Sequence, residues 1–157
     1  MSLNKKIIAV IGGSECGKEI EKLAYETGRE IAKAGYFLVC GGMQGVMEAA
    51  CRGAKDEGGM TVGILPGKSK SEANEFIDIP IVTAMSHARN AIIVRTADAV
   101  IAIGGKYGTL SEIGLAKSID KPVLGLKTWD IEGIIKVKTP AEAIKAVKKS
   151  LRTTSCE

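Results

Sequence analysis

Aromatic residues and long apolar runs are scarce in this sequence. Phe, Trp and Tyr make up 4% of its 157 residues, which leaves no evident stacking platform for single strands and argues against nucleic acid as a partner. No apolar run approaches the roughly 20 residues of a transmembrane helix, and the first residues lack the apolar region of a signal peptide. We therefore expect a cytoplasmic protein with no membrane partner.

Cysteine and histidine are too few and too scattered to indicate a metal site. His87 is the only histidine, and no two cysteines have the Cys-x-x-Cys spacing of a ligand pair or a redox motif. The four cysteines are Cys16, Cys40, Cys51 and Cys156. We expect them to be reduced thiols, with neither a bound metal nor a resident cofactor. The net charge of +4 is mild and comes largely from the C-terminal segment, as in a solvated helix.

What the chain does have is a regular alternation of short apolar runs and helical patterns. Runs typical of buried strands lie at 6–11, 36–40, 61–65, 76–82, 99–103 and 122–126. Helical patterns lie at 19–33, 46–55, 86–95 and 109–118, and a last one follows Pro140. The alternation predicts an α/β, Rossmann-like fold: a doubly wound, mostly parallel sheet in a three-layer α/β/α arrangement. A chain of this length can form one domain over residues 1–157.

Three of the predicted strands end in glycine-rich turns that lead into helices. Glycine lets backbone amides approach an anion closely, and the helix behind each turn adds its partial positive charge. The turns therefore predict contacts to phosphate or a nucleotide by Gly12, Gly13, Ser14, Gly41, Gly42, Gly45, Gly104, Gly105, Gly108 and Thr109. The plain alternative is that tight turns need glycine for a positive φ. Because ligands bind at the switch point of a doubly wound sheet, we expect the first and third turns to lie side by side.

Two classes of nucleotide-dependent enzyme lose their support at these turns. None of them ends in the Gly-Lys-Ser/Thr of a P-loop, which disfavours kinase-type phosphoryl transfer. The sequence also lacks Gly-x-Gly-x-x-Gly, the fingerprint of dinucleotide binding. Nicotinamide and flavin oxidoreductases are therefore disfavoured as well.

Two polar segments beside the turns are candidates for catalysis. Thr109-Leu110-Ser111-Glu112 fits a capping box, in which Thr109 caps a helix and Glu112 reaches back to the cap amide. Alternatively, the Glu112 carboxylate lies where a sugar would sit if phosphate occupied the turn. Upstream, the segment 85–90 opens a helix that can face the same crevice, with Met85 as a candidate nucleotide contact and Arg89 as a candidate catalytic cation. His87 has the simpler interpretation of a local hydrogen-bonding group.

Together these residues resemble the motif of a known family. Gly104-Gly105-x-x-Gly108-Thr109-x-x-Glu112, with His87-x-Arg89 upstream, is similar to the pattern of the LONELY GUY-type phosphoribohydrolases, long mislabelled as lysine decarboxylases. The likeness extends to Gly41-Gly42-x-x-Gly45-x-Met47 and to Gly12 and Ser14, so it covers nearly the whole chain.

The resemblance implies both a reaction and roles for individual residues. Enzymes of this family bind a nucleoside 5′-monophosphate and hydrolyse its N-glycosidic bond, releasing free base and ribose 5-phosphate, and they form homodimers or larger assemblies. By the same resemblance, Gly105, Gly108 and Thr109 would hold the phosphate, and Arg89 and Glu112 would be the catalytic pair. A carboxylate near the ribose can stabilise the oxocarbenium-like centre that forms as the base leaves.

At three positions the sequence departs from the family pattern. Ile103 stands in place of a proline, Ala88 in place of the usual glutamate, and Asn90 in place of a lysine. A divergent branch that includes molybdenum-cofactor carrier proteins looks similar in this way: it keeps the fold and the glycine turns but binds a phosphate-bearing pterin without converting it. DNA-processing proteins with related domains are a third class, which the scarcity of aromatics disfavours. A hydrolase and a carrier are the two functions left open.

Apolar helical surfaces predict self-association. Ile92, Ile93 and the helix from Leu110 to Ile119 are the candidate interface elements of a homodimer or a higher homo-oligomer. The alternative is that these side chains all belong to the core of a single chain.

Overall fold

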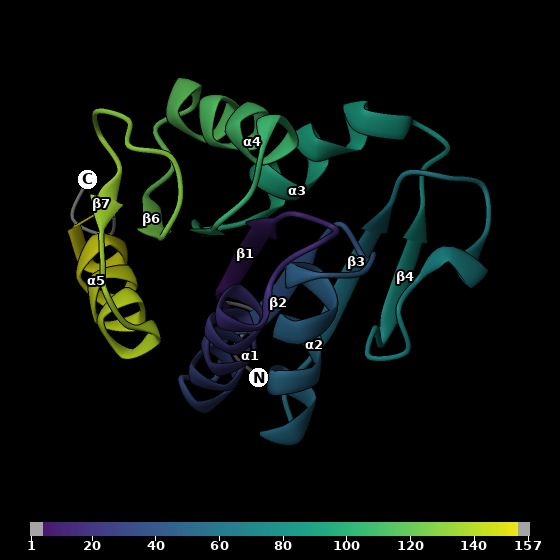
Figure 1. Ribbon diagram of the computed structural model, residues 1–157, viewed down its shortest axis with the longest axis horizontal. Helices are drawn as coiled ribbons and strands as arrows, with labels where there is room; N and C mark the ends of the chain where they lie inside the picture. The colour runs from purple at the N-terminus through teal and green to yellow at the C-terminus, as the bar shows by residue number, and fades with distance from the viewer. Residues whose placement is uncertain (1–4, 154–157) are drawn as a thin grey trace.

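The computed structural model describes residues 5–153, and in this range the chain forms one parallel sheet (Figure 1). In spatial order the strands are β4-β3-β2-β1-β5-β6-β7, and every neighbouring pair is parallel. Their bounds are β1 Ile7–Gly12, β2 Phe37–Cys40, β3 Thr61–Leu65, β4 Ile79–Val82, β5 Ala99–Ile103, β6 Val123–Leu126 and β7 Ile135–Lys136. The α/β fold class with a parallel, doubly wound sheet is therefore confirmed.

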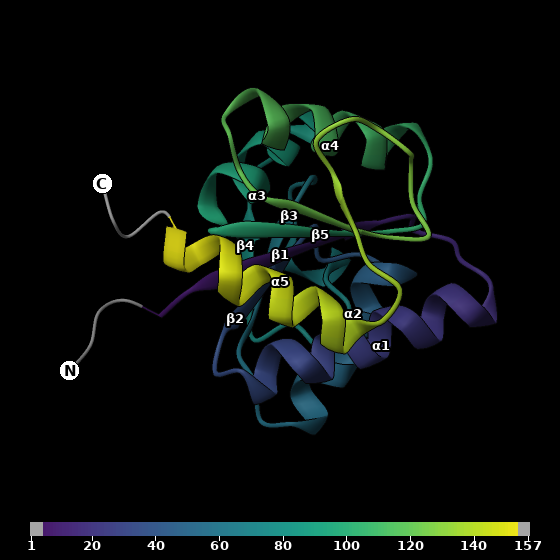
Figure 2. The same cartoon turned by 90° about the vertical axis from the view of Figure 1, so that its left-hand side faces the viewer.

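Helices cover both faces of the sheet and complete three layers (Figures 1 and 2). One face carries α1 (Lys18–Lys33), α2 (Val46–Asp56) and α5 (Pro140–Thr153). The other carries α3 (Asn90–Thr96) and α4 (Tyr107–Ser118). Two short 3-10 helices, η1 (Lys70–Glu72) and η2 (Ser86–Arg89), lie in the connections.

The side chains of β1 explain why the central strands read as continuous apolar runs. Ile8 and Val10 point into the core beneath α1, α2 and α5, whereas Ala9 and Ile11 point into the core beneath α3 and α4. All four are at most 2% exposed. A strand with helices on both faces has no solvent side, so it needs apolar residues at every position.

Several boundaries differ from the sequence-based expectation. The last crossover before β5 is split, because η2 precedes a short α3 where a single helix was expected over 86–95. The helix expected to begin at Thr109 begins at Tyr107, and β4 begins at Ile79 within the run predicted over 76–82. The short edge strand β7 was not predicted. Cys156 lies outside the described residues.

The switch point of the sheet lies between β1 and β5, as expected. The register pairs Gly12 with Ile103, so the two strands end together and their following loops lie side by side. From β1 the chain runs outward to β4, then returns to β5 and runs outward again to β7. Within residues 5–153, no helix has both the length and the apolar character needed to cross a membrane.

Two glycines allow α1 and α2 to pack closely against each other. A Cβ on Gly28 would overlap the carbonyl oxygen of Ala50, and a Cβ on Gly53 would overlap the carbonyl oxygen of Tyr25. Each glycine therefore makes room for the backbone of the opposite helix. Both helices support the loops that follow β1 and β2, so this contact fixes one wall of the switch point.

We expect Gly28→Ala to destabilise the protein, although alanine favours helix formation. The new methyl group would push apart two helix backbones that cannot yield as side chains do, at a cost of about 2 kcal/mol or more. The matched control is Gly114→Ala in α4, where a Cβ meets nothing within 4 Å; it should stabilise by ~0.5–1 kcal/mol. Urea unfolding of both variants tests this, and equal effects would contradict it.

Candidate functional site

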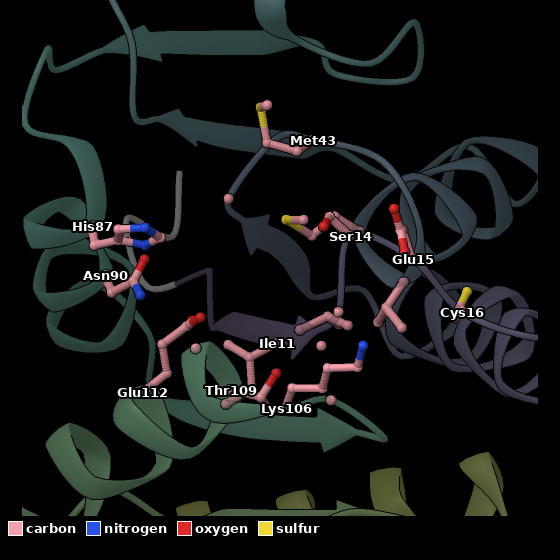
Figure 3. A pocket seen from close by; sticks show the side chains of 18 of the residues that line it. Ile11, Ser14, Glu15, Cys16, Met43, His87, Asn90, Lys106, Thr109 and Glu112 are labelled. Carbon is pink, nitrogen blue, oxygen red and sulfur yellow. The ribbon is translucent and has the colours of Figure 1, made fainter.

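A cavity of about 580 Å³ opens at the carboxyl ends of the strands, above the switch point (Figure 3). Its walls come from the loops after β1, β2 and β5 and from η2. The sequence-predicted residues that line it are Gly12, Gly13, Ser14, Gly41, Arg89, Gly105, Gly108, Thr109 and Glu112. Elements that are far apart in the chain thus bring most of the candidate residues to one place.

Four of the candidate residues do not line the cavity. Gly42, Gly45 and Gly104 have φ values of +77°, +67° and +54°, which only glycine adopts without strain. Their position fits the plain alternative, in which glycine serves the turn itself. Met85 is 46% exposed and likewise lies outside the cavity lining.

Arg89 lines the cavity, and neutral oxygens hold its guanidinium. Its Nε donates to the carbonyl of Ile64 at 2.8 Å, and its Nη2 donates to the carbonyl of Gly41 at 3.5 Å. Its Nη1 donates to the side-chain oxygen of Asn90. The side chain is 8% exposed, and this burial lowers the pKa of Arg89, while the charge of Glu112 opposes the shift.

The segment leading to Arg89 is strained. Ala84 and Ser86 both have a φ of +53°, a conformation that side-chain-bearing residues rarely adopt. Backbone bonds from their amides to Gly67 and Pro66, of 2.8 and 2.9 Å, hold the segment in place. Such strain is typical of functional segments, and here it sets η2 at the cavity rim with His87 among the lining residues.

Glu112 points into the cavity, and the capping-box interpretation of this residue is wrong. The helix begins at Tyr107 with Lys106 as its N-cap, so Thr109 is already the third helical residue and its side chain caps nothing. Among the described residues, none donates a hydrogen bond to the Glu112 carboxyl group, which lies near Asn90 in Figure 3. The side chain is 8% exposed, and burial raises its pKa to about 7, although the charge of Arg89 acts in the opposite direction.

No direct ion pair joins Arg89 and Glu112, although both belong to the described part of the chain. The cation is held by neutral oxygens, and the carboxyl group has no protein partner. A buried carboxyl group with a pKa near neutrality occurs as both acid and base at physiological pH. This is the protonation behaviour expected of a catalytic acid or base, or of a group that binds a polar ligand.

The loop after β5 lines the same cavity and carries backbone amides without hydrogen-bond partners in residues 5–153. Within the described chain, none of the backbone N–H groups of residues 105–109 has a hydrogen-bond acceptor. They lie at the N-terminus of α4, where the helix dipole favours negative charge. Gly105 has a φ of +92°, and a Cβ there would overlap the side chain of Thr109. Only glycine therefore permits this loop.

Several residues line the cavity without having been predicted from the sequence. Lys106, in the loop after β5, places its ammonium group over the cavity in Figure 3. Met43 and Met47 form an apolar wall after β2, and Glu15 and Cys16 line the mouth after β1. Of these residues, only Met47 belongs to the family pattern that the sequence resembles. The described residues contain no cluster of three or more potential metal ligands among His, Cys, Asp and Glu.

A parallel sheet with a ligand-sized cavity and an amide-rich loop at its switch point defines the class of Rossmann-like ligand-binding domains. Within that class, residues 5–154 match the model of the family described as "SLOG cluster4 family". The match covers most of the chain. This protein therefore belongs to the SLOG cluster4 family.

The chain is similar to proteins whose names describe different functions. A molybdenum cofactor binding protein from Rippkaea orientalis is structurally similar, with a TM-score of 0.91 and 37% identity over 96% of this chain and 99% of that one. A cytokinin riboside 5′-monophosphate phosphoribohydrolase from Mycobacterium tuberculosis is 34% identical over 120 residues, which are 71% of this chain and 64% of that protein. An uncharacterised protein from Archaeoglobus fulgidus is 50% identical over 138 residues.

We expect Glu112→Gln to stabilise the protein at pH 8 far more than at pH 5. The carboxyl pKa is about 7 when folded and ~4.3 in an unfolded chain. The stability that the neutral carboxyl contributes is complete below the unfolded pKa and is lost as pH rises through the folded pKa. Between pH 5 and pH 8 the free energy of unfolding of the wild type should therefore fall by roughly 2 kcal/mol, and that of the variant should not show this fall. Urea unfolding at both pH values measures this. An equal difference in the free energy of unfolding between variant and wild type at pH 5 and pH 8 would contradict it.

Proposed function

We propose that the cavity binds a nucleoside 5′-monophosphate and that Glu112 promotes hydrolysis of its N-glycosidic bond in the cytoplasm. The observation that carries this proposal is the buried Glu112 carboxyl group, which has no protein partner and a pKa of about 7. It lies in one cavity with the free amides of residues 105–109. Phosphate on the amides would place the ribose between the loop and the carboxyl group.

The reaction adds water across the bond between C1′ and the base nitrogen. As this bond breaks, its electron pair stays on the base and positive charge develops at C1′. The Glu112 carboxylate can stabilise that charge and orient the attacking water. The hydroxide of the water remains on C1′ as the hydroxyl of ribose 5-phosphate, and its proton balances the base that leaves.

Arg89 contributes a fixed positive charge to the same cavity. Its three hydrogen bonds to protein oxygens leave two of the five N–H groups of a guanidinium available. These can face the phosphate ester or the departing base. The phosphoribohydrolase relatives support the proposal by their names, although this chain spans only 64% of the first of them.

A second candidate is non-catalytic carriage of a phosphate-bearing cofactor such as the molybdenum cofactor, bound as cargo. The specific observation in its favour is the bond from Arg89 to Asn90. It ties the guanidinium to a neutral side chain at one of the three positions that depart from the enzyme pattern. The full-length likeness to a molybdenum cofactor binding protein supports the same candidate. Both candidates require a phosphate on the amides of residues 105–109.

We expect the wild type to release free base and ribose 5-phosphate from AMP or a related monophosphate. In Glu112→Gln, turnover should fall by a factor of about 10² or more, because the charge that stabilises C1′ is lost. The affinity for AMP should change little, because the loop of residues 104–109, called the phosphate loop below, is intact. Chromatography of the products and calorimetric titration measure the two effects separately.

The matched control is Glu132→Gln, an exposed carboxylate outside the cavity lining. It should behave as the wild type does. Wild-type protein that binds monophosphates but releases no base over long incubation would reject hydrolysis and favour the carrier. Protein that binds no phosphate-bearing ligand would reject both.

We also propose that the chain self-associates through the outer face of α4. This face carries no charged side chain over Tyr107, Ser111, Gly114, Leu115 and Ser118, all of which are exposed. Leu115 is 38% exposed, and an uncharged helix face of this kind favours an interface. Of the two isoleucines considered from the sequence, Ile93 is 1% exposed and belongs to the core, and Ile92 packs against that core.

Sedimentation at micromolar concentration should detect a dimer or a larger assembly. Leu115→Glu should shift it toward the monomer, because the interface would have to bury an unpaired charge. Ile135→Glu is the matched control, since Ile135 is similarly exposed, at 42%, but lies on β7. A monomeric wild type would reject this proposal.

A further inference from the structure

The segment after β6 donates two side-chain hydrogen bonds to the phosphate loop. The Thr128 hydroxyl donates to the carbonyl of Gly104 at 2.6 Å, and the Trp129 indole N–H donates to the carbonyl of Lys106 at 3.0 Å. The indole also contacts the ring of Tyr107, with 5.7 Å between the ring centroids. Neither Thr128 nor Trp129 lines the cavity.

The order of the strands places this segment and the cavity on opposite sides of the loop. β5 lies between β1 and β6, so the loop after β5 lies between the loop after β1, which lines the cavity, and the segment after β6. The amide of Gly104 also bonds to the carbonyl of Leu126 on the β6 side. The bond from Thr128 therefore holds the Gly104 carbonyl away from the cavity. The Lys106 carbonyl accepts from both the Leu110 amide of α4 and the Trp129 indole, so Trp129 ties the start of the helix to the segment after β6.

The direction of these carbonyls sets the direction of the amides that an anion needs. In a planar trans peptide the N–H points opposite to the C=O of the same unit. With the carbonyl of Gly104 held on the β6 side, the N–H group of Gly105, a residue that lines the cavity, is turned the opposite way, toward the cavity. It is one of the five amides without an acceptor in residues 105–109.

The loop needs such support because its own backbone is permissive. Gly104 and Gly105 have φ values of +54° and +92°, and glycine also adopts the opposite sign readily. A flipped peptide would present a carbonyl oxygen to the cavity and repel an anion. Lys127, with a φ of +48°, forms the turn that brings Thr128 to the loop.

We propose that Thr128 and Trp129 are positioning residues that keep the amides of the phosphate loop directed at the ligand. This inference rests on the proposed function, because it assumes that a phosphate occupies the amides of residues 105–109. It assigns no contact between these two side chains and the ligand. Their removal should therefore weaken phosphate binding from outside the cavity.

The test compares Thr128→Val with Thr128→Ser by calorimetric titration with AMP and with inorganic phosphate. Valine has the shape of threonine without the hydroxyl, and one lost hydrogen bond should weaken AMP binding by about tenfold. Serine keeps the donor and should restore most of the affinity. The matched control is Thr96→Val, which removes a 2.6 Å bond from Thr96 to the carbonyl of Ile92 in α3 and should leave binding unchanged.

A second variant and a spectroscopic signal make the test independent of Thr128. Trp129→Phe keeps an aromatic ring beside Tyr107 but removes the N–H donor, and it should also weaken binding. Trp129 is the only tryptophan, so saturating AMP should change its emission in the wild type with the midpoint found by calorimetry. A purely structural contact would lower the melting temperature without changing affinity in the folded protein.

The possible results distinguish a failure of the positioning role from a failure of the proposed function. Wild-type affinity in folded Thr128→Val and Trp129→Phe would overturn the positioning role and leave the proposed function intact. Equal weakening in Thr128→Val and Thr128→Ser would also overturn it, because the hydroxyl would then be irrelevant. A wild type that binds neither AMP nor phosphate would remove the proposed function and this inference with it.

Discussion

The cost of burying a cation and a carboxyl group in one cavity governs the arrangement of the site. Arg89 and Glu112 are each 8% exposed, and a charge that leaves water must find compensation. The fold does not pair them directly. It surrounds the guanidinium with neutral oxygens from Ile64, Gly41 and Asn90 and leaves the carboxyl group without a partner. The carboxyl group responds by retaining its proton up to a pKa of about 7.

The other features of the site follow from this arrangement. Two of the three oxygens that hold Arg89 belong to the ends of β2 and β3, so the guanidinium also joins neighbouring strands. The strained residues Ala84 and Ser86 lie just before Arg89, and their amides bond to the loop that follows β3. At the opposite wall, the register of β1 with β5 places the amide loop beside the first glycine turn. In the described part of the chain, the cavity therefore combines one fixed cation, a loop of unpaired backbone amides and one unpaired acid.

The sequence predicted those features that local pattern encodes. Strands buried on both faces are continuous apolar runs, so β1, β3 and β5 were identified close to their true bounds. The glycine turns at strand ends located the cavity. The capping box failed because the local pattern at Thr109 does not reveal that Leu110 bonds back to Lys106 and starts the helix earlier. Contacts between distant segments, such as that of Trp129 with Lys106, leave no local pattern at all.

The same physics connects the departure at Asn90 with the protonation state of Glu112. The enzyme pattern has a lysine at this position, and a second cation beside the carboxyl group would lower its pKa. Here the position holds a neutral amide that accepts a hydrogen bond from Arg89, so burial dominates and the pKa stays near 7. At neutral pH part of the protein then carries a protonated Glu112, which can donate a hydrogen bond to a ring nitrogen or carbonyl of the ligand. That capacity would serve either proposed ligand, a departing base or a pterin, equally. Hydrolysis would in addition require the ionised fraction to stabilise charge at C1′.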